Sequence, residues 1–171
     1  YIALLYKTMP APSVRDAVAL FIKDEPLDEF NPFLNLVQMY IEPADPMNYG
    51  RYMVKEPWPR VTAKDIFQTE GFTDSYAPIL GIEAFGVSMG LSPVAPQIQA
   101  VPGFALRNLP LLTEFPVVHN AGDHTAVFMQ YMAPPQRDGH FVIFDVPAAE
   151  KQHAKFLGSL AETGTATLVA P

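Results

Sequence analysis

The sequence predicts an α/β fold, in which the strands of a mostly parallel sheet alternate with helices. Residues 125–132 form an almost continuous apolar run, which is typical of a strand buried on both faces of a sheet. Residues 65–70 are a second β-prone stretch and end at a turn residue, Gly71. A segment with apolar residues at helical spacing follows each stretch, and 49% of the 171 residues are hydrophobic, enough to bury the core of one domain.

The first sixty residues are expected to form a helical cap or lid, since short helical patterns alternate there with prolines. Residues 1–6 are an apolar run that we expect as a strand end or a buried loop. Ser13 is a suitable N-cap for a first helix, and Pro26 limits its extension. The apolar residues that give this helix its spacing are Val14, Val18, Phe21 and Ile22.

Two further helices are predicted in the cap. Asn31 can cap one that ends before Pro43, and Asp45 can cap a shorter one that runs through Met53. Large apolar side chains of this region either line a substrate pocket or hold the cap helices on the body of the protein. These side chains are Phe30, Phe33, Leu34, Met39, Met47, Met53 and Trp58.

Residues 61–171 are expected to hold the sheet and its helices. A helix over 79–89 follows the first strand, and the prolines of 91–112 indicate an irregular excursion or hairpin. After the second strand come a loop and a helix over 148–160, for which Gly164 is a stop signal. The predicted order is therefore cap, strand, helix, excursion, strand, loop and helix.

Two groups suited to proton transfer follow the two predicted strands. Asp74 ends the segment Gly-Phe-Thr-Asp at 71–74, and His140 lies in Asp-Gly-His-Phe at 138–141. The carboxyl ends of parallel strands meet at one edge of a sheet, so we expect the two side chains there. An imidazole can take and return a proton near neutral pH when a carboxylate fixes its tautomer. The alternatives are a turn or helix-cap aspartate and a surface or capping histidine.

The two loops resemble the acid loop and the histidine loop of the α/β-hydrolase family. The residues that carry the resemblance are Gly71, Asp74 and Pro78 in the first loop, and Gly139, His140, Pro147, Phe156 and Leu157 in the second loop and its closing helix. The resemblance implies that residues 61–171 are the C-terminal core segment of a three-layer α/β-hydrolase sandwich and that residues 1–60 are its helical cap. It also implies that Asp74 orients the imidazole and that His140 is the general base.

The segment Gln-Thr-Glu-Gly at 68–71, together with Asp-Gly-His-Phe at 138–141, also resembles bacterial lipase-like lipoproteins. This similarity implies a secreted or cell-envelope location. Residues 1–5 are too short for the core of a signal peptide, and the chain begins at Tyr1, so we expect a processed or partial chain with any targeting segment upstream.

The nucleophile departs from the family pattern. Residues 86–90, Gly-Val-Ser-Met-Gly, match G-x-S-x-G, but the residues before them predict a helix instead of the strand that the strained turn requires. Ser88 also follows Asp74, whereas the serine comes first in the family. The resemblance therefore implies that the nucleophile, the oxyanion-hole donors and the N-terminal strands are missing from this chain, which is either a fragment or one subunit. An alternative keeps Ser88 as the nucleophile, with Asp123 or another carboxylate as its acid.

The function that the resemblance implies is a serine ester hydrolase of lipase or esterase type, acting on a small-molecule or lipid ester and inactive without the missing half. One alternative is a noncatalytic binding protein of the same fold. Another is a metal hydrolase that uses His119, Asp123 and His124, although their spacing fits no helical ligand pair. We expect this cluster to be a loop beside the active site, and we expect no metal and no cofactor.

Composition excludes several other classes. The net charge is −7 and the 11 Lys and Arg residues are scattered, which argues against a nucleic-acid surface. No window approaches the eighteen apolar residues that a membrane span requires. The absence of cysteine excludes disulfides and thiolate metal sites.

Overall fold

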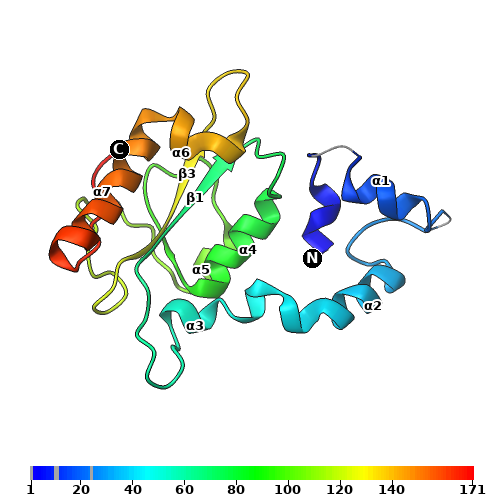
Figure 1. Ribbon diagram of the computed structural model, residues 1–171, viewed down its shortest axis with the longest axis horizontal. Helices are drawn as coiled ribbons and strands as arrows, with labels where there is room; N and C mark the ends of the chain where they lie inside the picture. Colours follow the sequence, from blue (N-terminus) through cyan, green and yellow to red (C-terminus); the bar gives the residue numbers. More distant parts are fainter. Residues whose placement is uncertain (1, 10–11, 24) are drawn as a thin grey trace.

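The structure is a computed structural model that describes residues 2–9, 12–23 and 25–171. The predicted mixed α/β class is confirmed: the described residues contain a small parallel sheet with helices on both of its faces (Figure 1). Its strands lie in the order β1, β3, β2. They are β1 Ile66–Phe72, β2 Ser92–Pro93 and β3 Ala126–Met132.

The two longer strands agree with the sequence prediction. β1 and β3 pair in parallel over their full length, from Ile66 opposite Ala126 to Phe72 opposite Met132. β3 is the central strand and is buried over its first six residues, which explains its continuous apolar sequence. β2 was not predicted, because two residues that include a proline carry no strand signal, and its pairing depends on the neighbouring β3.

Helices cover each face of the sheet, so that β1 side chains alternate between two layers (Figure 1). On one face, Gln68 donates from Nε2 to the carbonyl of Ile82. On the other face, the ring of Phe67 contacts Phe156 with 5.6 Å between centroids. The helices are α4 Ile79–Met89 and α5 Pro102–Leu106 on the first face, and α6 Val142–Asp145 and α7 Pro147–Thr163 on the second.

The helices α4 and α7 lie where the sequence predicts them. α4 has the predicted bounds and ends at Gly90 with a φ of 75°. α7 extends the predicted helix by one residue at its start and three at its end, and Gly164 closes it with a φ of 75°. Both glycines adopt the left-handed conformation that favours this residue at a helix end.

The N-terminal region that the sequence predicts as a cap is helical, as its prolines and N-cap residues indicate. Asn31 accepts the N–H of Leu34 at 3.0 Å, and Asp45 accepts that of Met47 at 3.0 Å. Two predictions need correction. Residues 2–6 form a 3-10 helix instead of a strand end or a loop, and the third predicted helix is divided into two short elements. The elements are η1 Ile2–Tyr6, α1 Val14–Ala19, α2 Pro32–Ile41, η2 Glu42–Ala44, η3 Pro46–Asn48 and α3 Arg51–Val54.

None of the described helices combines the length and the apolar character that crossing a lipid bilayer would require.

Candidate functional site

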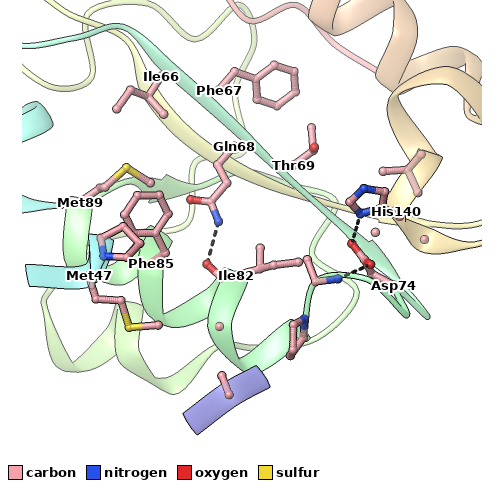
Figure 2. A pocket seen from close by; sticks show the side chains of 18 of the residues that line it. Met47, Ile66, Phe67, Gln68, Thr69, Asp74, Ile82, Phe85, Met89 and His140 are labelled. Carbon is pink, nitrogen blue, oxygen red and sulfur yellow. Dashed lines mark hydrogen bonds and ion pairs between the residues drawn. The ribbon is translucent and has the colours of Figure 1, made fainter. Parts of the chain in front are cut away.

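Asp74 and His140 lie side by side at the carboxyl end of the sheet (Figure 2). Asp74 is two residues beyond β1, and His140 lies in η4, Gly139–Phe141, in the loop after β3. The Oδ2 atom of Asp74 is 3.1 Å from Nδ1 of His140, although 66 residues separate them in the chain. Adjacent parallel strands therefore bring together the two side chains that the sequence singled out, and their catalytic roles stay a prediction.

The carboxylate of Asp74 serves two functions at once. Its Oδ1 accepts the backbone N–H groups of Tyr76 and Ala77 at 2.8 and 2.7 Å, which is the turn-forming role that an aspartate before a helix commonly has. Its Oδ2 faces the imidazole, and the side chain is only 6% exposed. The turn thus fixes the carboxylate in the orientation that meets His140.

The imidazole of His140 is held on several sides but is not enclosed. Its side chain is 43% exposed, and its ring lies against Tyr76, with 4.9 Å between centroids, and edge-on to Phe141, at 5.1 Å. Because an ionised carboxylate can only accept, the contact with Asp74 requires the hydrogen on Nδ1. In the neutral ring, Nε2 then keeps its lone pair, and no hydrogen bond joins it to any of the described residues.

Two glycines let the loops come this close. A Cβ atom on Gly139 would overlap the carbonyl oxygens of Gly71 and Phe72 and would lie 2.6 Å from the backbone nitrogen of Asp74. A Cβ atom on Gly71 would in turn overlap the carbonyl of Gly139. The backbones of the two loops are therefore in direct contact, and a side chain at either position would separate them.

We expect Gly139→Ala to destabilise the protein by about 1–3 kcal/mol, because the backbone must shift to accept the methyl group. Thermal or urea unfolding measures this loss. Gly158→Ala is the matched control: Gly158 lies within α7 with no neighbour within 4 Å of the added methyl, and alanine there should stabilise the helix by up to about 1 kcal/mol. Equal stability of Gly139→Ala and the natural chain would contradict the close approach.

A pocket of about 750 Å³ extends from this pair along β1 and α4 (Figure 2). Asp74 and His140 lie at one end of it, and Phe85 and Met89 lie toward the other. Most of its remaining lining is apolar, with Gln68 as a polar exception whose Oε1 is buried without a partner. The pair therefore opens onto an elongated apolar space.

Few of the cap side chains predicted to line a pocket do so. Met47 and Met53 line it, whereas Leu34 packs in a separate small cluster with Leu5 and Leu27. The others are more than half exposed, although the ring of Trp58 lies 4.9 Å from that of Tyr52, centroid to centroid. They are Phe30, Phe33, Met39 and Trp58. Neither pocket lining nor attachment to the body accounts for these four.

Ser88 lies near the end of α4 and does not line the pocket. Its hydroxyl donates to the carbonyl of Phe85 at 2.8 Å, within its own helix, and contacts Gly50 of the cap. Gly86 lies against the ring of Phe128, and Gly90 ends the helix. The serine and the two glycines of the G-x-S-x-G match are thus used in packing or helix termination, and the structure does not bring Ser88 to His140.

The loop of His119, Asp123 and His124 lies at the opposite end of the sheet, so its predicted place beside the active site is wrong. It precedes β3, and Nδ1 of His124 is 3.5 Å from Asp65, which precedes β1. A seven-residue strand separates this end from His140 by roughly 20 Å. Among the described residues, no group of three or more His, Cys, Asp or Glu side chains is placed to hold a metal ion.

The sequence analysis overlooked a buried polar cluster beneath α4. Glu70 of β1 is fully buried, and neither of its carboxylate oxygens has a hydrogen-bond partner. It stands opposite Gln130 of β3, whose Nε2 also lacks one, and Glu83 of α4 is buried nearby. Burial, and next the negative charge of Glu83, raise the pKa of Glu70 to about 7, and the nearby amide of Gln130, too poorly placed for a normal hydrogen bond, offsets only a part of this rise. The available signal was a polar residue at alternate positions of β1, Gln68 and Glu70, and one in the otherwise apolar β3, Gln130.

Comparisons of this chain with protein-family models, curated proteins and solved structures find no match.

Proposed function

We propose that this chain supplies the acid and the base of a serine ester hydrolase of the α/β-hydrolase type. The observation that supports this most directly is the contact between Asp74 and His140 at one end of an apolar pocket. The carboxylate is buried and fixed by two backbone N–H groups, while the side chain of His140 is 43% exposed. A buried carboxylate behind an accessible imidazole is the arrangement that general base catalysis requires.

The chemistry follows from the tautomer that Asp74 imposes. Nε2 of His140 takes the proton from a serine hydroxyl as its oxygen bonds to the ester carbonyl carbon, and the resulting imidazolium returns the proton to the leaving alcohol as the ester C–O bond breaks. Water, deprotonated by the same nitrogen, then releases the acyl group and regenerates the serine. Asp74 stabilises the imidazolium at each step.

The serine of this proposal comes from outside the described residues, on a part of the sheet that pairs with β1. The N–H of Ile66 donates to Thr125 at 2.8 Å, toward β3. Alternation along a strand then directs the backbone polar groups of Phe67 and Thr69 to the other edge. Four consecutive residues of β1, 66–69, line the pocket. If only one face of the sheet lined the pocket, alternate residues would do so, and the consecutive run therefore indicates that the pocket lies along the unpaired edge of β1. An unpaired edge is suited to a further strand.

The substrate class follows from the pocket. Beyond His140 it is lined by flexible thioethers and an aromatic ring, including Met47, Met89 and Phe85. Such a surface accommodates the acyl or aromatic part of an ester and offers no cluster of positive charge for an anionic group. We therefore propose an ester with an apolar portion, as a small molecule or a lipid.

A serine-directed fluorophosphonate tests the proposal on the complete gene product. We expect one serine outside residues 1–171 to be labelled, and His140→Ala to abolish the labelling because the serine then loses its base. Ser88→Ala is the control and should be labelled like the natural protein.

Labelling that persists in His140→Ala would remove His140 from the mechanism. Peptide mapping that finds the label on Ser88 would move the nucleophile into this chain. No labelling of any residue would favour the noncatalytic binding protein.

A further inference from the structure

A second aspartate connects the two loops that carry the candidate pair. Asp138 precedes η4, and its Oδ1 accepts the backbone N–H of His140 at 2.9 Å. The same oxygen accepts the backbone N–H of Ser75 at 3.2 Å, and Oδ2 accepts the hydroxyl of Ser75. One carboxylate on the histidine loop thus binds donors on both loops.

The arrangement is reciprocal with the candidate pair. Asp74 of the acid loop reaches the ring of His140, while Asp138 of the histidine loop reaches the backbone of Ser75, the next residue after Asp74. The carbonyl of Ser75 also accepts the N–H groups of Thr8 and Met9, at 3.1 and 2.9 Å. All three polar groups of Ser75 are therefore used to hold the acid loop in place.

A local structural role does not account for these contacts. Capping η4 needs only the bond from Asp138 to the N–H of His140. The two bonds to Ser75 span 63 residues of sequence and contribute nothing to that cap. They do fix the distance between the backbones that carry Asp74 and His140.

The carboxylate is suited to this role because it stays ionised. Partial burial opposes ionisation, but the hydrogen bonds from Ser75 and from the N–H of His140 outweigh it and lower the pKa of Asp138. Hydrogen bonds to an ionised acceptor are stronger than those between neutral groups.

We propose that Asp138 is a positioning residue for the reaction proposed above, acting through Ser75 to hold the imidazole of His140 against Asp74. The inference rests on that proposed function. Asp138 does not line the pocket, and it contacts the backbone of His140 and not its ring. Its removal should therefore affect the chemical step and leave binding of the substrate unchanged.

The test uses the complete gene product and the fluorophosphonate, with the maximal labelling rate and the half-saturating probe concentration measured separately. Asp138→Ala should lower the maximal rate by about 100-fold, the effect expected when a catalytic group is misplaced by about 1 Å, and leave the half-saturating concentration within about twofold. Asp138→Asn, whose oxygen can still accept the two N–H groups, should recover part of the rate. Ser75→Ala, which loses only the hydroxyl bond, should lower it by about tenfold.

Asp16→Ala is the control, because Asp16 also accepts the N–H and the hydroxyl of a serine, Ser13, at 2.9 and 2.7 Å, but does so within the cap of its own helix and does not line the pocket. It should label at the natural rate. If His140→Ala abolishes labelling while Asp138→Ala keeps a rate within twofold of the natural one, the positioning role is refuted and the proposed function stands. If Asp138→Ala does not fold, natural rates in both Ser75→Ala and Asp138→Asn overturn the inference.

Discussion

Under the proposed function, replacing Asp74 with Asn should lower the turnover number of the complete gene product by about 10⁴-fold, with little change in KM. The asparagine oxygen can still accept the N–H groups of Tyr76 and Ala77, so the turn is kept. Its amide nitrogen, however, donates toward Nδ1 of His140, which places the ring hydrogen on Nε2. In that tautomer Nε2 has no lone pair with which to accept the serine proton. The rate of hydrolysis of a chromogenic acyl ester, measured over a range of substrate concentrations, tests this expectation.

The chain offers a matched control at the other end of the sheet. Asp65 and His124 form a second aspartate–histidine contact, at 3.5 Å, in the loops that precede the strands. Asp65→Asn changes a carboxylate of the same kind beside an imidazole. It should leave the turnover number within about threefold of the natural value, since the imidazole of His124 does not line the pocket that His140 lines. A turnover number within tenfold of natural for Asp74→Asn would show that Asp74 does not orient the base.

The features that the sequence predicted well depend on local chemistry or on a simple rule of strand geometry. Asn31 and Gly164 mark helix ends through interactions within a few residues. The meeting of Asp74 and His140 required only that two neighbouring strands be parallel. Both inferences hold without knowledge of the rest of the fold.

The features that the sequence predicted poorly depend on contacts between distant segments. β2 exists through pairing with β3, and nothing within Ser92–Pro93 indicates it. The loop of His119 was placed at the wrong end because composition suggests a loop but not the edge of the sheet on which it lies. Asp138 and Ser75 were likewise not linked, since their contact depends on a backbone approach that Gly71 and Gly139 permit.

Glu70→Gln should remove a pH dependence of stability that the natural chain carries. In the folded protein, burial and Glu83 raise the pKa of Glu70 to about 7 from an ordinary value of 4.5. Between these two pH values the folded state holds a proton that the unfolded state has released, so the free energy of unfolding falls as the pH rises. The loss amounts to as much as about 3 kcal/mol by pH 8, at about 1.4 kcal/mol for each pKa unit. Below about pH 4.5 no loss occurs.

Glutamine has nearly the shape of protonated glutamate and cannot ionise. Gln130 lies opposite position 70, and its Nε2 can donate to the side-chain oxygen of the new glutamine. Glu70→Gln should therefore match the natural chain near pH 4.5 and exceed its stability by up to about 3 kcal/mol at pH 8, as urea unfolding at a series of pH values would show. The exposed Glu162 provides the control, since its replacement by Gln leaves the buried cluster intact and should keep the natural pH dependence. If the stabilities of Glu70→Gln and the natural chain fall in parallel from pH 5 to 8, then Glu70 is not the group that retains the proton.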